Sequence, residues 1–243
     1  MSIFIQPRRP TREWLDDPTL VPISDVRQNL EDLRSIHTWG GARALERHLS
    51  ARIRELGSNE RMRPLRILDV GAGSGDLAGR LQRGLRRRGH GATVVALDLR
   101  WRHLRTGRAM AMAAAATPAP AAAAVAGDAF RLPFADGAFD LSISTLFFHH
   151  FSPEENRGLL GEMARVAPHG VAVLDLRRHR APALFVSLAG PLIFRSPVSV
   201  HDGLASVNQA YTVDEALAIA KDAVPRPRAR RVFPFRWLLT SGA

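Results

Sequence analysis

The residues best placed to do chemistry stand where short apolar runs end. Residues 67–70 read as a buried strand, and the turn after it places glycines at Gly71, Gly73 and Gly75. Without a Cβ atom, these glycines let the chain turn sharply and let a ligand lie against the backbone. The pattern predicts a site for an adenosine-containing cofactor, with Asp69 and Ala72 among its contacts.

The glycine spacing in this turn distinguishes between two kinds of cofactor. Dinucleotide-binding proteins carry a third glycine where this chain has Asp76. A carboxylate there would lie at a helix N-terminus, where a pyrophosphate should bind, and would repel it. A nicotinamide oxidoreductase is therefore disfavoured. A cofactor without phosphate, such as S-adenosylmethionine, suffers no such repulsion.

An acidic residue ends the second predicted strand. The run Ala92 to Asp98 is apolar until its last residue, and Asp98 follows the glycines by the interval expected of a ribose-binding carboxylate. We expect Asp98 to accept hydrogen bonds from both ribose hydroxyls and Leu99 to contact the same ligand. The alternative is that Asp98 only caps the helix that follows.

Two further strand ends extend the predicted cofactor site. The run Ala121 to Ala126 leads into Asp128, Ala129 and Phe130. Asp128 is placed to accept from an adenine amino group, and Phe130 to lie against the ring. The fourth predicted strand, Leu141 to Leu146, contributes Ser144 and Thr145 to the same edge.

Two histidines and several aromatic residues follow the fourth strand. His149 and His150 are candidates for catalysis because imidazole is the natural base near neutral pH. His149 is the preferred base, and His150 is expected to hold the loop through a hydrogen bond. The alternative is that both are structural. Phe148 and Phe151 are expected to face an apolar acceptor.

This series of motifs resembles the class I S-adenosylmethionine-dependent methyltransferases. The resemblance covers about residues 65 to 176. Within this class, the chain is most similar to the small-molecule type related to ubiquinone and menaquinone biosynthesis. It rests on the segments named above and on further matches in the same order: residues 132–134, residues 139–140, and residues 162–167 before Gly170. One departure is His169 before Gly170, where a double glycine is usual.

The resemblance implies an α/β fold: a Rossmann-like, doubly wound, seven-stranded and mainly parallel sheet. We expect a single methyltransferase domain over 1–243. An N-terminal helical cap (1–60) would precede the cofactor-binding core (61–180). A substrate-side insertion (181–210) would come before the last core helix, and residues 211–243 would supply that helix and the final strands. Trp39, Gly40 and Gly41, which join two cap helices, are candidates for touching the cofactor.

Several residues are expected on the acceptor side. Arg177 ends the fifth predicted strand, and Phe185 belongs to an apolar helix over residues 183–194. His201 and Tyr211 are polar candidates in and after the insertion. His201-Asp202 resembles a base with its orienting carboxylate, although adjacency in sequence argues against that geometry.

Residues 195–208 are expected to form a polar loop. Thr212 and Glu215 are expected to form a capping box at the last core helix.

Composition narrows the class of protein. The chain has 243 residues, no cysteine and a formal net charge of +11. Lys221 is the only lysine, and the arginine, alanine, glycine and proline content fits a GC-rich bacterial genome, so the charge does not require a nucleic-acid partner. No signal peptide, membrane span or metal-ligand spacing is found. We expect a cytoplasmic monomer or homodimer without a metal, a nucleic acid or a membrane as partner.

The sequence therefore predicts a methyltransferase that uses S-adenosylmethionine on a small apolar acceptor of aromatic or polyketide-like type. It would act in bacterial secondary or quinone metabolism. O-methylation is favoured, and C-methylation of an activated ring is the first alternative. An RNA or protein methyltransferase is a second alternative, supported by the charge. A binding module that has kept the fold without catalysis is a third.

Overall fold

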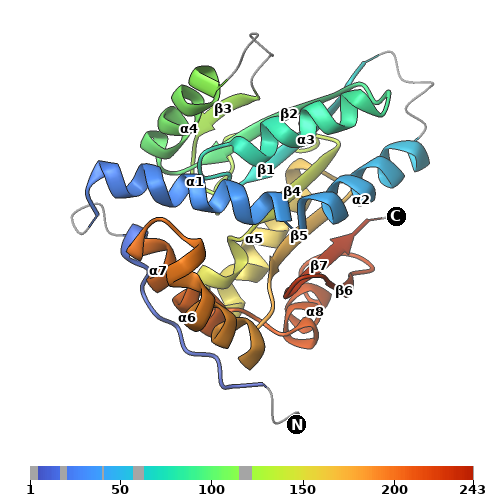
Figure 1. The fold of residues 1–243 in the computed structure, drawn as a ribbon. Helices are drawn as coiled ribbons and strands as arrows, with labels where there is room; N and C mark the ends of the chain where they lie inside the picture. Colours follow the sequence, from blue (N-terminus) through green and yellow to red (C-terminus); the bar gives the residue numbers. More distant parts are fainter. Residues whose placement is uncertain (1–4, 17–20, 40, 57–62, 115–121, 243) are drawn as a thin grey trace.

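The computed structural model describes residues 5–16, 21–39, 41–56, 63–114 and 122–242 (Figure 1). Of the residues predicted to touch the cofactor, the Trp39 side chain and residue 40 lie outside what the structure describes, and Gly41 is buried. The chain forms a seven-stranded sheet in the order β3-β2-β1-β4-β5-β7-β6. The predicted α/β fold with a mainly parallel sheet is confirmed.

The first five strands of the chain run parallel, and the hairpin at the end of the chain reverses direction. β7 is antiparallel to both of its neighbours, β5 and β6. Parallel strands end at one edge of a sheet, so the loops that carry the predicted site residues come together there. The strands are β1 (Leu65–Val70), β2 (Ala92–Asp98), β3 (Ala123–Ala126), β4 (Leu141–Thr145), β5 (Val171–Leu176), β6 (Arg228–Val232) and β7 (Arg236–Ser241).

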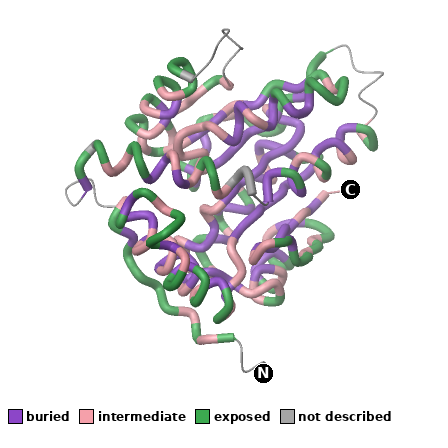
Figure 2. The backbone as a smooth tube through the Cα atoms, viewed as in Figure 1, coloured by how far each residue is buried: buried purple, intermediate pink, exposed green. Residues whose placement is uncertain are grey.

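Helices cover both faces of this sheet, and the strands between them are the most buried part of the molecule (Figure 2). α2 (Gly41–Glu55), α3 (Asp76–Arg87) and α4 (Trp101–Ala114) pack on one face, while α5 (Pro153–Val166) and α8 (Val213–Lys221) pack on the other. Side chains alternate between the faces along a strand. Accordingly, Ile67 joins the first core and Leu68 the second, and both are fully buried.

The capping signals at the last core helix are confirmed. The Thr212 hydroxyl accepts from the Glu215 backbone N–H, and the Glu215 carboxylate accepts from the Thr212 N–H at 2.8 Å. This reciprocal pair starts α8. An equivalent box between Ser152 and Glu155 starts α5, directly after the histidines. The helix that follows the site is therefore fixed at its first turn.

The predicted polar loop over residues 195–208 is wrong, because most of it is helical. After α6 (Arg180–Ile193), α7 spans Pro197–Gln209 and packs against it. Ser196 caps α7 by accepting from the Val198 N–H, and Pro197 occupies the first turn, where its missing N–H costs nothing. Val198, Ala205 and Val207 are buried on its inner side. The polar residues between them concealed this pattern.

The N-terminal part of the chain lies against the insertion helices. A short 3-10 turn, η1 (Trp14–Asp16), contacts α7, and α1 (Ile23–Trp39) contacts both α7 and α2 (Figure 1). Arg9 donates a backbone hydrogen bond to the carbonyl of Asn208 at 3.0 Å. Residues 5–16 therefore bring their side chains to the neighbourhood of the histidines.

None of the helices in the described ranges combines the length and the apolar composition that crossing a bilayer requires. The most apolar of them, α6, has 14 residues. A membrane-spanning helix needs about 20. The exposed apolar side chains of α6, such as Leu188 and Leu192, lie on one short helix.

Candidate cofactor and acceptor site

The turn after β1 has the geometry that its glycines predict. Gly71, Gly73 and Gly75 all have positive φ, between 55° and 70°. A Cβ atom on Gly71 would lie 2.4 Å from the ring of Phe147, whereas one on Gly73 would meet nothing within 4 Å. The Ala72 N–H donates to the Leu97 carbonyl at 2.9 Å, which joins the turn to β2. The turn is packed on one side and open at Gly73.

Asp98 binds the same turn. Its Oδ2 accepts from the Gly73 N–H at 2.7 Å, and its Oδ1 accepts from the Arg100 N–H at 2.8 Å. The side chain is only half-buried. Each carboxylate oxygen has a second acceptor position, so Asp98 can hold the turn and accept hydrogen bonds from a ligand at the same time.

Asp69, at the end of β1, is a buried carboxyl group with an unusual environment. Its side chain is 1% exposed, and neither oxygen has a hydrogen-bond partner among the described residues. Burial, and to a lesser extent the charge of Asp98, raise the pKa of Asp69 to about 8. A buried acceptor without a donor is costly. A cationic or hydrogen-bonding ligand at the turn would remove that cost.

The other predicted cofactor residues line the ends of the neighbouring strands. Leu99, after β2, is 73% exposed, and Phe130, after β3, is 36% exposed. Asp128 accepts from the Phe130 N–H at 2.9 Å, and Ala129 is buried. Two apolar side chains thus flank this edge of the sheet, as a flat ring would require. The residue roles themselves stay predictions.

Ser144 and Thr145 end β4 beside this turn. Both side chains are buried, and within the described part of the chain neither hydroxyl has a hydrogen-bond partner. Residue 144 is paired in register with Val70, the last residue of β1. Two further hydroxyls therefore lie at this end of β4, beside the end of β1.

His149 is held between two carboxylates. It lies in η2 (Phe148–His150) and is 2% exposed. Its Nδ1 is 2.7 Å from Asp175 Oδ1, and its Nε2 is 3.4 Å from Glu13 Oε1. Burial lowers the pKa of His149, but Asp175 and Glu13 together outweigh burial and raise it to about 10. Without another cation at this position, the imidazole is protonated at neutral pH.

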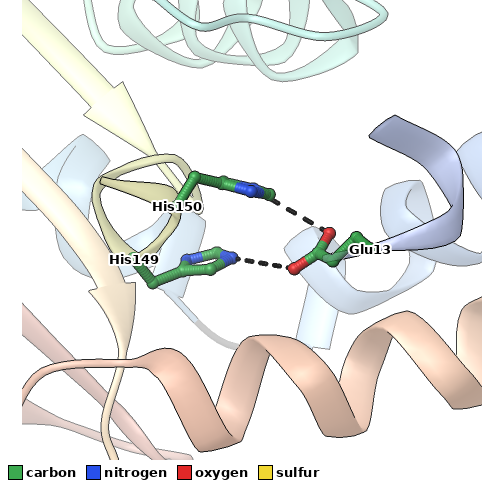
Figure 3. Close-up of side chains that lie close together, drawn as sticks. All are labelled: Glu13, His149 and His150. Atoms are coloured by element: carbon green, nitrogen blue, oxygen red, sulfur yellow. Dashed lines mark ion pairs between the residues drawn. The ribbon is translucent and has the colours of Figure 1, made fainter. Parts of the chain in front are cut away.

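Glu13 is a site residue that the sequence did not reveal. It is 7% exposed and lies across from the two histidines (Figure 3). Its Oε1 accepts hydrogen bonds from Ser206 and Gln209 of α7. Burial raises the pKa of Glu13, but the histidines and Ser206 outweigh it and hold the pKa below its ordinary value. The proline-rich N-terminal segment offered no motif that pointed to this carboxylate.

His150 is less buried than His149. The two rings stack with centroids 4.3 Å apart, and His150 Nε2 lies 3.9 Å from Glu13 Oε2. The backbone N–H of His150 donates to the Phe147 carbonyl at 3.3 Å. The structure thus brings both predicted catalytic histidines to one carboxylate.

Two of the residues predicted to contact the acceptor lie in the core instead. Phe148 is fully buried and packs edge-to-face on Tyr211 and Trp237. Tyr211 is 2% exposed, and its hydroxyl donates to the Phe151 carbonyl at 2.7 Å. Both side chains belong to the hydrophobic core on the sheet face that α5 and α8 cover. Neither residue can touch an acceptor in this conformation.

An aromatic row leads from the glycine turn toward the acceptor side. Phe147 packs on Gly71. Phe151 meets Phe147 edge-to-face at 4.7 Å and Phe130 at 4.9 Å. We call Phe147, Phe151 and Phe130 the aromatic row. Of the predicted acceptor residues, Phe151 is the one that the structure brings to the cofactor turn through these contacts.

The remaining predicted acceptor residues are dispersed. Phe185, on α6, is 46% exposed and lies 6.3 Å from the ring of Phe235. Arg177 donates its backbone N–H to the Phe235 carbonyl, and its buried Nε has no hydrogen-bond partner among the described residues. Burial, and then Arg231, lower the pKa of Arg177. These two residues lie near the β6–β7 turn.

His201 forms the hydrogen bond that its adjacency to Asp202 argued against. His201 Nδ1 is 2.8 Å from Asp202 Oδ1, and the ring stacks on Trp14 at 3.9 Å. Asp202 also accepts from the backbone N–H groups of Trp14 and Leu15. This pair therefore fastens the N-terminal segment to α7.

Comparisons with known proteins agree with this geometry. A family model described as "Methyltransferase domain" matches residues 67–170. Demethylmenaquinone methyltransferase of Thermus thermophilus is 32% identical over 166 residues, which make up 68% of this chain and 70% of that protein. A methyltransferase of Aquifex aeolicus, described as SAM-dependent, has a similar fold, with a TM-score of 0.53 at 18% identity, covering 82% of this chain and 96% of that one. Magnesium protoporphyrin IX methyltransferase of Synechocystis, solved with bound SAH, also has a similar fold. Its TM-score is 0.55 at 16% sequence identity, covering 93% of this chain and 100% of that one.

Proposed function

Because this chain belongs to the class I S-adenosylmethionine-dependent methyltransferases, we propose that it methylates a small apolar acceptor of aromatic or polyketide-like structure. Bound S-adenosylmethionine supplies a methyl group on a sulfonium. The protein has to hold this cofactor, align the acceptor with the methyl group and exclude water.

The residues at the turn fit this cofactor. Gly73 leaves room for a ligand against the backbone, and Asp98 has acceptor positions left for ribose hydroxyls. Asp69 is a buried carboxyl group without a donor in the described part of the chain, which suits the ammonium group at the amino-acid end of the cofactor. Leu99 and Phe130 are apolar and exposed where an adenine ring would need them.

The observation that carries the acceptor class is the aromatic row. Its rings begin at the glycine turn with Phe147 and continue through Phe151 to Phe130. Aromatic pairs prefer edge-to-face contacts, and a flat apolar acceptor can extend such a row. A quinone-like ring is further supported by the relative that is named demethylmenaquinone methyltransferase.

O-methylation needs a group that takes the hydroxyl proton. The raised pKa of His149, about 10, keeps its imidazole protonated near neutral pH, so it is a poor base. His150 is less buried and lies 6.3 Å from Phe147, ring centre to ring centre. We therefore assign the proton-accepting role to His150 and a positioning role to His149.

C-methylation of an activated ring is the second candidate. A ring carbon that is already electron-rich reacts with little help from a base. The two carboxylates that keep His149 protonated are compatible with this alternative, because it needs no neutral imidazole at that position.

The proposal is tested in two steps on the purified chain. Isothermal titration with S-adenosylmethionine, S-adenosylhomocysteine and NADH should show binding of the first two only. A panel of phenols, naphthoquinols, transfer RNA and peptide is then incubated with methyl-labelled cofactor. Label on a phenolic or quinol acceptor supports the proposal, and NMR of the product distinguishes O- from C-methylation. Label on RNA or peptide alone would overturn it, and cofactor binding without any transfer would favour a binding module.

Replacing Gly73 with alanine should weaken cofactor binding about tenfold or more. The added methyl group would enter space that the ligand needs, and overpacking of this kind costs about 1 to 3 kcal/mol. Gly89→Ala is the matched control, since Gly89 has a φ of +79° with nothing near a Cβ and lies in the distant turn after α3. Both variants should lose similar stability in urea. Equal cofactor affinity in both would count against a ligand at Gly73.

The affinity for S-adenosylmethionine should rise with pH between about 6 and 8. The pKa of Asp69 is about 8 in the free protein, so this carboxyl group is protonated below that pH. A cationic ligand favours the carboxylate, so binding must release a proton over that range. Titration calorimetry in buffers of different ionisation enthalpy measures the release. In Asp69→Asn the rise should vanish, and a slope that survives there would show that another group titrates.

A further inference from the structure

We infer that Glu13, His149 and His150 form a binding site for a divalent transition-metal ion, with zinc as the first candidate. Each residue offers one ligand atom, and these atoms all lie within 4.8 Å of one another (Figure 3). The sequence analysis expected no metal, because it judged only spacings along the chain. The fold brings Glu13 to the histidines from the far end of the sequence.

The ligand types and distances suit such an ion. Imidazole nitrogen and carboxylate oxygen bind zinc at about 2.0 to 2.2 Å, which places neighbouring ligand atoms about 3.4 Å apart in a tetrahedron. His149 Nε2 lies 3.4 Å from Glu13 Oε1, and His150 Nε2 lies 3.9 Å from Glu13 Oε2. Two histidines and one glutamate leave a fourth position for water or an acceptor oxygen, as in catalytic zinc sites.

The surroundings of His149 support the same conclusion. Its buried Nε2 makes no hydrogen bond of good geometry to the described residues, although it faces the carboxylate of Glu13. Its other nitrogen, Nδ1, is held at 2.7 Å by Asp175. A carboxylate behind a histidine fixes the ring and makes the facing nitrogen a better ligand, and this arrangement is common at metal sites.

Further contacts orient the carboxylate of Glu13. Ser206 and Gln209 both donate to Oε1, while Oε2 points toward His150. The carboxylate is therefore presented to the histidines by two hydrogen bonds from α7. Asp175 and Glu13, which outweigh burial at His149, would equally favour a dication between the rings.

If the proposed function holds, the ion has a clear task there. The cluster adjoins the aromatic row through Phe147, whose ring lies 6.3 Å from that of His150. The acceptor oxygen would occupy the fourth position on the ion, and the ion would lower the pKa of the acceptor's hydroxyl group so that its proton is released to water. In the loaded protein, this replaces the proton-accepting role assigned to His150.

Zinc titration of the full chain, stripped of metal with a chelator, tests the site independently of methyl transfer. We expect a single zinc ion per chain, with magnesium unable to compete. Cobalt in place of zinc should give the visible absorption of a four-coordinate site. Glu13→Gln and His150→Gln should each weaken zinc binding at least tenfold. The controls Glu154→Gln and His90→Gln, at an exposed carboxylate and a distant turn, should bind zinc as the original chain does.

Asp175→Asn adds a test of the positioning role. It leaves all three ligands in place, so zinc affinity should fall about 10- to 100-fold without being lost. Circular dichroism and binding of S-adenosylhomocysteine are recorded for every variant, so that a misfolded protein is not mistaken for a lost site. The inference is overturned if zinc binds weakly and without fixed stoichiometry, or if Glu13→Gln binds it as tightly as the original chain. Neither outcome bears on whether the chain binds S-adenosylmethionine.

Discussion

Replacing Asp98 with alanine should weaken S-adenosylmethionine binding by about a hundredfold to ten-thousandfold. Hydrogen bonds to a charged group contribute about 1.5 to 3 kcal/mol each, and we expect this carboxylate to accept two from the ribose. It also accepts from the Gly73 and Arg100 N–H groups, so its loss loosens the turn that the cofactor rests on. Isothermal titration of the variant and the original chain measures the change in dissociation constant.

Two measurements separate the ribose contact from the support of the turn. Asp98→Asn keeps an acceptor for the Gly73 N–H, so it should restore much of the lost stability but only part of the affinity. Asp222→Ala removes an exposed carboxylate at the end of α8 and should leave binding unchanged. If Asp98→Ala bound the cofactor as tightly as the original chain, the residue would be only a helix cap.

Replacing Asp175 with alanine should cost about 3 to 5 kcal/mol in the free energy of unfolding. This fully buried carboxylate accepts from His149 Nδ1, from the His149 backbone N–H at 3.0 Å and from the Leu176 N–H. Its removal leaves a buried imidazole with one carboxylate instead of two, and two backbone donors without an acceptor. Breaking a buried ion pair from one side costs this much because the partner stays buried.

Urea unfolding in the presence of a chelator measures the loss without any contribution from metal. Asp175→Asn is the conservative partner, because its amide oxygen can still accept one of the three hydrogen bonds, and it should lose less. A loss under about 1 kcal/mol in Asp175→Ala would mean that water replaces the carboxylate. The anchoring of η2 to β5 would then have to be reconsidered.

The positions of the predicted cofactor residues follow from local rules, which is why the sequence predicts where they lie in the fold. Gly71 and Asp98 each end a run of apolar residues, and parallel strands bring such ends to one edge. The contact between the Gly73 N–H and the Asp98 carboxylate is the direct result. The capping box of Thr212 and Glu215 is equally local, and it also forms as predicted.

The acceptor side depends on packing between distant segments, and there the sequence is less informative. Glu13 stands in a proline-rich stretch, and only the fold shows that it faces the histidines. An aromatic run such as residues 147–151 does not reveal which ring turns inward, and Phe148 proves to be core. α7 was missed because its polar residues, including Asp202, are used to bind the N-terminal segment rather than solvent.

The N-terminal segment has a consequence for how this enzyme can be re-engineered. Arg8 donates to the carbonyls of His149 and Phe151 and stacks on Tyr211, while Glu13 completes the polar cluster. Arg8 and Glu13 both lie outside residues 67–170, the part that matches the family model. A chimera that exchanged only residues 5–16 for those of another methyltransferase would keep the glycine turn and Asp98. On the proposed function, it would nevertheless present a different wall to the acceptor, so selectivity could be recombined separately from cofactor use.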